Sequence, residues 1–341
     1  MKYDVTIGIP VYRAEPYIRK TMESAVSQSY PSIEFLVVDD GSDDQSVDII
    51  NGLCASHSRG KDIRIITHSQ NQGVSASRNQ IIDEAQGDYL YFLDADDIIM
   101  ENTIALLIQN IRQYDAEIVF GSYEKIELSG ERILYQYPSL QLMGKDQLAE
   151  FAYRRYAGIQ ASACNFLLKT SLLKERPLRF IDTDYWEDFA FTFDLVTYIS
   201  RAVLLPEVTY SYLCRENSLS HYQGRTRISK AEILRNIHTI DHLKKTSSTL
   251  YNKVYFPNRC FNIVMTDFYM ACNIIKRRKN IVPSISNGEI KAMMAHPATF
   301  RQICSFHQSR FKNLVLYLLG KLPSSLCVVA VWIIGKVKKL I

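Results

Sequence analysis

Several motifs that would place this chain of 341 residues in a familiar class are missing from it. None of its seven cysteines stands in a C-x-x-C spacing, so neither a zinc knuckle nor a disulfide framework is indicated. No G-x-G-x-x-G follows the first apolar run, and no G-x-x-x-x-G-K-[ST] occurs, which argues against a dinucleotide-binding motif and a P-loop. The N-terminal apolar run is too short for a signal peptide. A reducing, cytosolic setting is therefore the simplest interpretation.

Acidic residues are scarce in the last third of the chain. Residues 222–341 contain 20 Lys and Arg but only 4 Asp and Glu, a net charge of +16, whereas residues 1–221 contain 20 and 32, a net charge of −12. Such asymmetry suggests that the basic part faces an anionic partner, either nucleic acid or an anionic membrane surface. Because the basic part shows no nucleic-acid-binding motif, we expect the membrane surface and no nucleic acid.

No apolar run is long enough to cross a bilayer as a helix. Residues 326–334 form a C-terminal apolar run, but a span of about 30 Å needs roughly 20 residues. Lysines flank this run on both sides: Lys321, Lys336, Lys338 and Lys339. We expect residues 314–341 to associate with a membrane interface, and a buried C-terminal helix is the alternative.

The sequence does have a regular alternation of strand and helix patterns. Continuous apolar runs predict strands at 4–11, 34–38, 63–67 and 89–93, and helical spacing of apolar residues marks 15–28, 44–55 and 74–85. This alternation predicts an α/β fold whose parallel sheet is covered by helices on both faces. Further strands are predicted at 117–127 and 202–212, and helices over 226–280.

A polar cluster follows each of the first four predicted strands. These clusters are Pro10-Val11-Tyr12, Asp39-Asp40-Gly41-Ser42, His68-Ser69-Gln70-Asn71 and Asp94-Ala95-Asp96-Asp97. Ligands bind at the carboxyl ends of strands in open α/β sheets, so the clusters predict a binding edge. Without a glycine-rich loop, a nucleotide diphosphate would need a divalent cation held by carboxylates, and the three acids after the fourth strand are candidates. Asp97 is also placed to cap the helix that follows.

Three stretches make the chain resemble the inverting family 2 glycosyltransferases, which have the GT-A fold. They are "VTIGIPVYRAEPYIRKTMESAVSQSYPSIEFLVVDDGSDDQS", "NQGVSASRNQIIDEAQGDYLYFLDADD" and "WEDFAF". The resemblance covers about residues 3–220. It implies a Rossmann-like GT-A catalytic domain with a mostly parallel sheet over residues 1–221, followed by a helical, basic C-terminal region over residues 222–341.

The resemblance assigns four residues to the nucleotide side of the site. Pro10 and Tyr12 would shape the base pocket, and Asp39 would accept a hydrogen bond from uracil N3–H. A turn with Gly41 suits Asp40 better than Asp39. Arg78 lies in the first turns of a predicted helix, where a cation is unfavourable with the helix dipole, and the family places such an arginine beside the nucleotide.

Other residues would hold the diphosphate and a Mn²⁺ or Mg²⁺ ion. Asp94 and Asp96 would form the D-x-D motif that contacts the ribose and the metal–diphosphate, with Asp96 as first choice for the metal ligand and Asp97 next. In "RENSLSH", Arg215 would pair with phosphate and His221 would be an additional metal ligand.

The acceptor side falls on the "WED" sequence. Asp188 would be the general base that takes the proton of the attacking hydroxyl, a contribution of about 10²–10⁴-fold in rate. Glu187 would bind an acceptor hydroxyl or cap the helix, and Trp186 would stack on the acceptor sugar.

These assignments predict a metal-dependent inverting transferase with a UDP-sugar donor, glucose or galactose favoured. The acceptor would be a polyprenyl-diphosphate-linked saccharide, N-acetylglucosamine-diphosphate-polyprenol favoured, in O-antigen or capsule synthesis at the cytoplasmic face of a bacterial inner membrane. A processive synthase would need transmembrane helices and Q-x-x-R-W, and a nucleotidyltransferase would need a glycine-rich loop; the chain lacks these features. A catalytically degenerate scaffold that binds sugar nucleotides is the alternative from another class.

Overall fold

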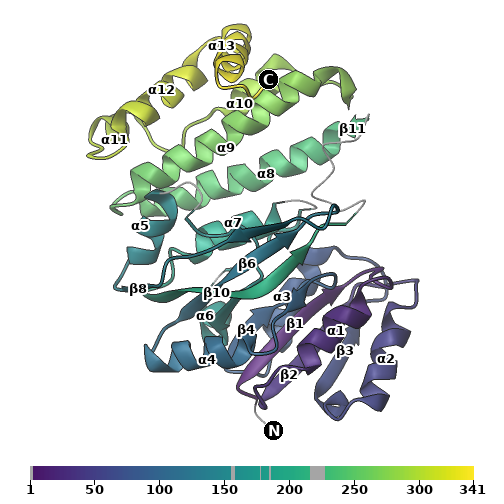
Figure 1. Cartoon of the computed structure of the whole chain (residues 1–341). Coiled ribbons are helices and arrows are strands. Elements are labelled where there is room, and N and C mark those ends of the chain that lie inside the picture. Colours follow the sequence, from purple (N-terminus) through teal and green to yellow (C-terminus); the bar gives the residue numbers. More distant parts are fainter. Residues whose placement is uncertain (1–2, 155–157, 177, 184–185, 216–226) are drawn as a thin grey trace. The chain divides into compact units, whose positions relative to one another are not determined.

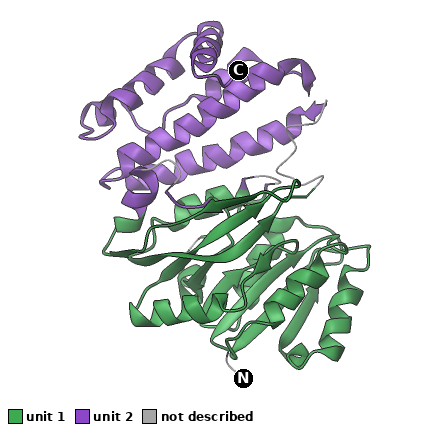
Figure 2. Ribbon diagram, viewed as in Figure 1, with its two compact units in different colours: residues 1–148, 161–182, 187–221 green, residues 149–160, 183–186, 222–341 purple. Residues whose placement is uncertain are grey.

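The computed structural model describes residues 3–154, 158–176, 178–183, 186–215 and 227–341. The chain divides into two compact units (Figure 2). Residues 1–148, 161–182 and 187–221 form the first unit, and residues 149–160, 183–186 and 222–341 form the second. The sequence pattern suggested a single boundary at residue 221 and gave no sign that the two short segments group with the C-terminal part.

The first unit is built on a sheet that has ten strands in the described part of the chain (Figure 1). They are β1 (Val5–Val11), β2 (Ile33–Asp39), β3 (Ile63–Thr67), β4 (Tyr89–Phe92), β5 (Ile98–Ile99), β6 (Ile118–Ile126), β7 (Arg132–Tyr135), β8 (Leu140–Met143), β9 (Phe166–Lys169) and β10 (Arg201–Leu213). The main order is β3-β2-β1-β4-β9-β6-β10-β5, with β7 beside β6 and β8 beside β10.

The direction of the strands follows the expected pattern in the first half of the sheet. Strands β3, β2, β1 and β4 are parallel, and most of their residues are apolar because helices cover the sheet. Strand β9 then runs antiparallel to both β4 and β6, while β10 is parallel to β6. Strands β5 and β8 are also antiparallel to β10, and β7 is antiparallel to β6. The predicted α/β class with a mostly parallel sheet is therefore confirmed.

Helices of the first unit join the strands. They are α1 (Ile18–Val26), α2 (Ser46–Ser56), α3 (Val74–Glu84), α4 (Thr103–Gln113), α5 (Gln147–Arg154, which continues into the second unit), α6 (Thr170–Glu175) and α7 (Glu187–Leu195). Helix α1 buries Ile18, Met22 and Val26, spaced at the helical period. Helix α3 approaches β1 so closely that a Cβ on Gly8 would lie 2.3 Å from Cγ2 of Ile81.

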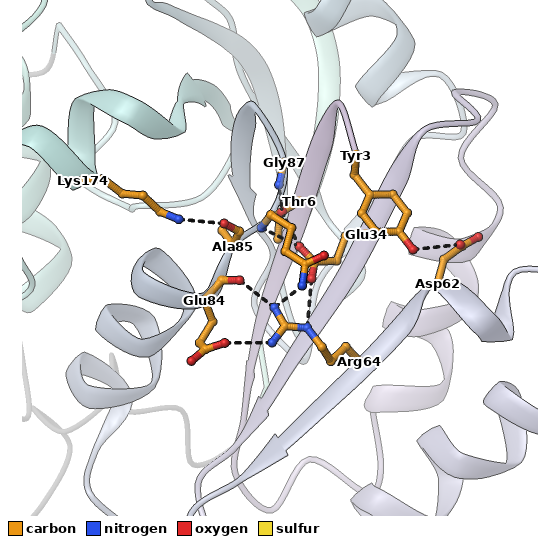
Figure 3. Close-up of polar contacts among 10 residues, drawn as sticks. Tyr3, Thr6, Glu34, Asp62, Arg64, Glu84, Ala85, Gly87 and Lys174 are labelled. Carbon is orange, nitrogen blue, oxygen red and sulfur yellow. Dashed lines mark hydrogen bonds and ion pairs between the residues drawn. The ribbon is translucent and has the colours of Figure 1, made fainter. Parts of the chain in front are cut away.

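An ion-pair network centred on the buried Glu34 joins the amino-terminal ends of the first strands (Figure 3). Glu34, 2% exposed, accepts hydrogen bonds from the Thr6 hydroxyl at 2.6 Å and from the guanidinium of Arg64 at 2.8 and 3.0 Å. It also accepts one from the backbone N–H of Gln86 at 2.9 Å, and Arg64 reaches on to Glu84 at 2.9 Å. Every partner lies at or just before the start of a strand or at the end of α3. The network therefore stabilises the amino-terminal ends of the strands, whereas the acids predicted to bind ligands follow the carboxyl ends.

The second unit is mostly helical. Its elements are α8 (Lys230–Ser247), α9 (Phe256–Arg277), α10 (Asn287–Met293), α11 (Phe300–Cys304), α12 (Arg310–Lys321), α13 (Ser324–Val337) and the short strands β11 (Ile228–Ser229) and β12 (Ile281–Val282). Helix α9 is buried along most of its length. Serine and threonine capping boxes begin α10 and α11. Within the described residues, no helix combines the length and apolar character that crossing a membrane requires.

Candidate active site

The acids after β4 have different surroundings. Asp97 is 1% exposed, and its carboxylate accepts hydrogen bonds from the Tyr210 hydroxyl at 2.6 Å and the Leu213 N–H at 2.8 Å, both at the end of β10. It caps no helix, because α4 begins later with Asn102 as its N-cap residue, so that alternative is wrong. Both oxygens of Asp97 thus have protein partners, which favours Asp96 over Asp97 as a metal ligand.

Burial and nearby negative charges oppose the ionisation of Asp96 and Asp97. Burial raises the pKa of Asp96 to about 6, and the negative charge of Asp94 adds to this effect against the attraction of Arg215. Burial, together with Asp96 and Asp94, raises the pKa of Asp97 well above its usual range. A cation at this position would relieve the repulsion and favour the ionised forms.

The oxygen donors suit a hard divalent cation whose other ligands come from a diphosphate and water, as is usual for Mg²⁺. Among the described residues, no group of three or more His, Cys, Asp and Glu side chains converges on a point where a metal ion would bind. Asp94 and Asp96 would therefore supply only part of a coordination sphere. His221, predicted as a further ligand, lies outside the described residues.

Arg78 joins the strand-end acids to the first turn of α7. Its Nη2 donates to Asp94 at 2.9 Å, and its Nη1 contacts Glu187 at 2.9 Å and, more closely, Asp188. The side chain is 4% exposed and lies over the Phe180 ring, with Cζ 5.3 Å from the centroid. The anions that offset its unfavourable position in α3 are thus carboxylates of the protein. Contact with a nucleotide stays a prediction, and the geometry favours a positioning role.

Asp188 lies in the first turn of α7, where the helix dipole favours a negative charge. Burial raises the pKa of Asp188 to about 8, against the opposing attraction of Arg78, and the like charges of Glu187 and Asp94 contribute. A carboxylate with a raised pKa is a stronger proton acceptor, which is what a general base requires. Trp186 precedes the helix with a left-handed backbone, φ 69°, and its proposed contact with an acceptor stays a prediction.

The end of β2 holds a buried carboxylate with one free oxygen. Asp39 is 1% exposed; its Oδ1 accepts from the Ser42 N–H at 3.2 Å, and its Oδ2 has no hydrogen-bond partner among the described residues. Asp40 accepts instead from the backbone N–H groups of Gln72 and Gly73, both at 2.8 Å. The turn assigned from the sequence to Asp40 is therefore made by Asp39, while Asp40 fixes the start of α3.

Tyr12 and Pro10 lie at the end of β1 beside this carboxylate, since Val11 pairs with Asp39 across the two strands. Tyr12 is 42% exposed, and the guanidinium carbon of Arg13 lies 5.2 Å from its ring centroid. Arg13 in turn forms a bidentate pair with Asp43 at 2.6 and 2.7 Å. The loop that carries Tyr12 is thus tied to the loop that follows Asp39.

Arg215 follows β10 and closes the site on its other side. Its Nε lies 2.5 Å from Oδ2 of Asp96, an ion pair that lacks hydrogen-bond geometry, and its guanidinium carbon lies 5.2 Å from the Tyr17 ring centroid. Asp96, Arg215, Tyr17 and Lys20 line a cavity of about 280 Å³. Tyr17 and Lys20 were not predicted as site residues, although they lie shortly after the first predicted strand, where a ligand-binding residue is expected. Tyr210 had no signal, because it lies inside a strand.

The structure thus brings together residues that the sequence places far apart. Asp94, Arg78 and Asp188 are in direct contact, and Asp96 pairs with Arg215. Asp39 and Tyr12 lie at the ends of the neighbouring strands β2 and β1. The arrangement offers a hydrogen-bond acceptor for a planar ligand, two carboxylates for a cation and one carboxylate with a raised pKa.

Comparison with known families and proteins gives a consistent result. The family model described as "Glycosyl transferase family 2" matches residues 6–176. An uncharacterized glycosyltransferase of Haemophilus influenzae is 27% identical over 266 residues, which are 78% of this chain and 92% of that protein. The Escherichia coli protein WfaP, named a UDP-Glc:alpha-D-GlcNAc-diphosphoundecaprenol beta-1,3-glucosyltransferase, is 28% identical over 237 residues, 68% of this chain and 86% of that protein.

Among solved structures, S. aureus TarS 1–349 in complex with UDP-GlcNAc has a TM-score of 0.62 at 19% identity. The likeness covers 94% of this chain and 90% of that one. At this level of identity the likeness concerns the fold, and it extends beyond the residues that the family model matches into the helical second unit.

Proposed function

The chain belongs to glycosyl transferase family 2, and from this premise we propose that it moves a sugar from a UDP-sugar to a saccharide carried on polyprenyl diphosphate. The enzyme is a glycosyltransferase with the GT-A fold. The choice of a uridine nucleotide rests on one observation: Oδ2 of Asp39 has no hydrogen-bond partner among the described residues. The glucosyl donor and the N-acetylglucosamine-diphosphate-lipid acceptor in the name of WfaP support the finer proposal, in which glucose or galactose is transferred in O-antigen or capsule synthesis.

Uracil suits the end of β2 because its N3–H needs an acceptor. A buried carboxylate oxygen without a partner is costly, and a base that donates to it would remove that cost. Ser42 N–H already uses the other oxygen, so one acceptor is left for the ligand. Tyr12, partly exposed at the end of β1, is placed to pack against the same base.

The D-x-D acids support a metal-dependent reaction. When bound, a Mn²⁺ or Mg²⁺ ion would neutralise charge on the diphosphate. Asp96, with Asp94, would hold it. Arg215 balances the charge of Asp96, and Arg78 balances that of Asp94. Arg215 is 35% exposed, against 4% for Arg78, and its Nε makes no hydrogen bond among the described residues, so it is the arginine that can turn from Asp96 toward a phosphate.

The chemical step is a single displacement. The acceptor hydroxyl oxygen bonds to the anomeric carbon, the bond from that carbon to the diphosphate oxygen breaks, and the hydroxyl proton passes to Asp188. The UDP leaves with the electron pair of the broken bond. Arg78 holds Asp188 close to Asp94, and so keeps the base near the place where the diphosphate would bind.

The place of action follows from the acceptor. A saccharide on a polyprenyl carrier is confined to a membrane, so we propose that the enzyme works as a peripheral protein at the cytoplasmic face of a bacterial inner membrane. The net charge of +16 over residues 222–341 supports attraction to anionic lipid headgroups.

The nucleotide proposal is tested by comparing UDP with CDP in calorimetry with Mn²⁺ present. Cytosine N3 is an acceptor and would face the Asp39 oxygen, so CDP should bind at least about tenfold more weakly than UDP. Asp39→Asn leaves one acceptor oxygen for two donors, the Ser42 N–H and uracil N3–H. It should weaken UDP binding and reduce the difference in affinity between UDP and CDP. Asp48→Asn, exposed on α2 directly after the same loop, is the matched control. Equal binding of UDP and CDP by the unaltered enzyme would refute the proposal.

A further inference from the structure

Helices α12 and α13 of the second unit are apolar on two sides. Their inner sides are buried in the core formed with α9 and α10, through Leu316 and Leu319 on α12 and Cys327 and Val331 on α13. Their outer sides also carry large apolar side chains, and these are exposed. We call the following eight the outer apolar surface: Phe311, Val315, Leu318, Leu326, Val329, Trp332, Ile333 and Val337.

The outer apolar surface follows the helical period. Phe311, Val315 and Leu318 are spaced by four and three residues, and Leu326, Val329, Ile333 and Val337 by three, four and four, which places each set on one side of its helix. Eight of the nineteen exposed large apolar residues in the described parts of the chain fall in this stretch of 27 residues. Exposed apolar residues are normally scattered singly, and contiguous ones mark a site of interaction.

The charges around this surface indicate what it meets. No Asp or Glu follows Glu289, whereas eight basic residues do: Lys291, Arg301, Arg310, Lys312, Lys321, Lys336, Lys338 and Lys339. Three of these lysines lie against aromatic rings: Lys336 Nζ is 5.0 Å from the Trp332 ring centroid, Lys321 Nζ is 5.0 Å from that of Tyr317, and Lys312 Nζ is 5.2 Å from that of Phe261. Aromatic rings beside lysines, next to an apolar stripe, suit the boundary between headgroups and acyl chains.

We propose that the outer apolar surface docks this enzyme on an anionic lipid bilayer, with α12 and α13 lying at headgroup depth. Helix α13 has 14 residues and is therefore about 21 Å long, too short for the roughly 30 Å of a bilayer core. A second copy of this chain is the less favoured occupant, because self-association would bring two sets of unbalanced cations together. The docking proposal depends on no assumption about the donor sugar.

Because the inner sides of α12 and α13 are part of the core, the expected membrane association of residues 314–341 cannot be tested by deleting these residues. Removing these residues would take Leu316, Leu319, Cys327 and Val331 out of the core and expose the side of α9 that they cover. A truncated chain would lose stability for that reason alone. Substitutions confined to the exposed stripe keep the core intact and report on docking.

The experiment measures flotation of the full chain with vesicles of phosphatidylcholine containing phosphatidylglycerol, and with vesicles of phosphatidylcholine alone. The test variant is Val329→Glu with Ile333→Glu, both half exposed on α13. The matched control is Leu234→Glu with Val254→Glu, at exposed apolar positions of the same unit outside the surface. Thermal unfolding verifies that each variant is folded.

We expect the unaltered chain to float with the anionic vesicles, less at high salt, and the test variant to lose at least about tenfold in bound fraction while the control binds normally. Equal flotation of test variant and unaltered chain, or no flotation of either, would overturn the proposal. So would a dimer of the unaltered chain that becomes a monomer in the test variant without vesicles. Turnover with a short-chain soluble acceptor, unchanged in the test variant, separates docking from the proposed reaction.

Discussion

The two ends of the same sheet hold buried carboxylates in opposite conditions. At the amino-terminal ends of the strands, Glu34 has a donor for each oxygen, and Arg64 connects it to Glu84 (Figure 3). At the carboxyl ends, one oxygen of Asp39 has no hydrogen-bond partner in the part of the chain that the structure describes, and the pKa values of Asp96 and Asp188 are raised to about 6 and about 8. Among the described residues, the protein alone satisfies Glu34, whereas it leaves one oxygen of Asp39 unpaired and opposes the ionisation of Asp96 and Asp188.

This difference indicates which end serves structure and which serves chemistry. A satisfied buried network stabilises one conformation and offers nothing to a ligand. Unpaired acceptors and crowded carboxylates cost stability, and a ligand that donates a hydrogen bond or brings a cation removes that cost. The contrast therefore predicts that substitutions at the carboxyl ends change binding and rate, while those at the amino-terminal ends change the free energy of unfolding.

The largest effect is expected for Asp188→Asn. The substitution keeps the shape of the side chain and removes the proton acceptor, so transfer should fall at least about 10²-fold, the low end for general-base catalysis. UDP binding with Mn²⁺ should change little, because Asp188 acts on the acceptor hydroxyl. Rate assays and calorimetry on the same preparation measure the two quantities.

Asp96→Ala is the matching variant on the donor side of the same site. It should lose metal-dependent UDP binding as well as turnover. Near-normal turnover of Asp188→Asn, or loss of its UDP binding, would place the base elsewhere, and Glu187, which shares the contact with Arg78, would be the next residue to substitute.

The sequence predicted the parallel half of the sheet closely, because buried parallel strands are continuous apolar runs. The strand predicted at 63–67 matches β3, and 89–93 differs from β4 by one residue. Strand β9 was not predicted, because its four residues Phe166–Lys169 are followed directly by α6 and so short an apolar run does not distinguish a strand from a helix. Nor does such a run show that the strand is antiparallel to its neighbours.

Site residues that directly follow a predicted strand could be identified from the sequence. Contacts between site residues that lie far apart in the chain could not. Asp94 and Asp96 follow an apolar run and are visible in the sequence. Arg78 meets Asp188 across 110 positions, which no local pattern encodes. The turn is made by Asp39 and not, as predicted, by Asp40, for a different reason. Successive side chains at the end of a strand point to opposite sides, and the sequence does not say which side faces the turn.

A smaller effect, on stability alone, is expected for Glu34→Gln. The amide keeps the volume but replaces an acceptor by a donor that faces Arg64, so the free energy of unfolding should fall by about 2 kcal/mol, the scale of a hydrogen bond to a charged group. Urea unfolding measures this change, and turnover per folded molecule should be unaltered. Glu84→Gln, at the exposed end of the same network, is the control and should cost at most about 1 kcal/mol. A loss of UDP affinity in Glu34→Gln would contradict the division of roles between the two ends.

The smallest effect is a shift in the pH dependence of kcat/KM, caused by Arg78→Lys. The base must be ionised, and burial raises the pKa of Asp188 to about 8, so activity should decline as the pH falls through the pKa of Asp188. Arg78 lowers that pKa by favouring the charged carboxylate. A lysine does not reach Asp94, Glu187 and Asp188 together, so the pKa should rise and the acidic limb should move to higher pH by up to about one unit, equivalent to about 1.4 kcal/mol.

The measurement compares the acidic limbs of the two enzymes at one saturating Mn²⁺ concentration, with thermal unfolding to verify that the variant is folded. Arg13→Lys, whose exposed pair with Asp43 does not involve the base, is the control and should leave the limb in place. A limb that stays where it was in Arg78→Lys, or moves to lower pH, would mean that Arg78 does not set the ionisation of the base. Arg78 would then only connect Asp94, after β4, to α7 through its ion pairs. Its role at the carboxyl ends of the strands would be structural, like that of Arg64 at the amino-terminal ends.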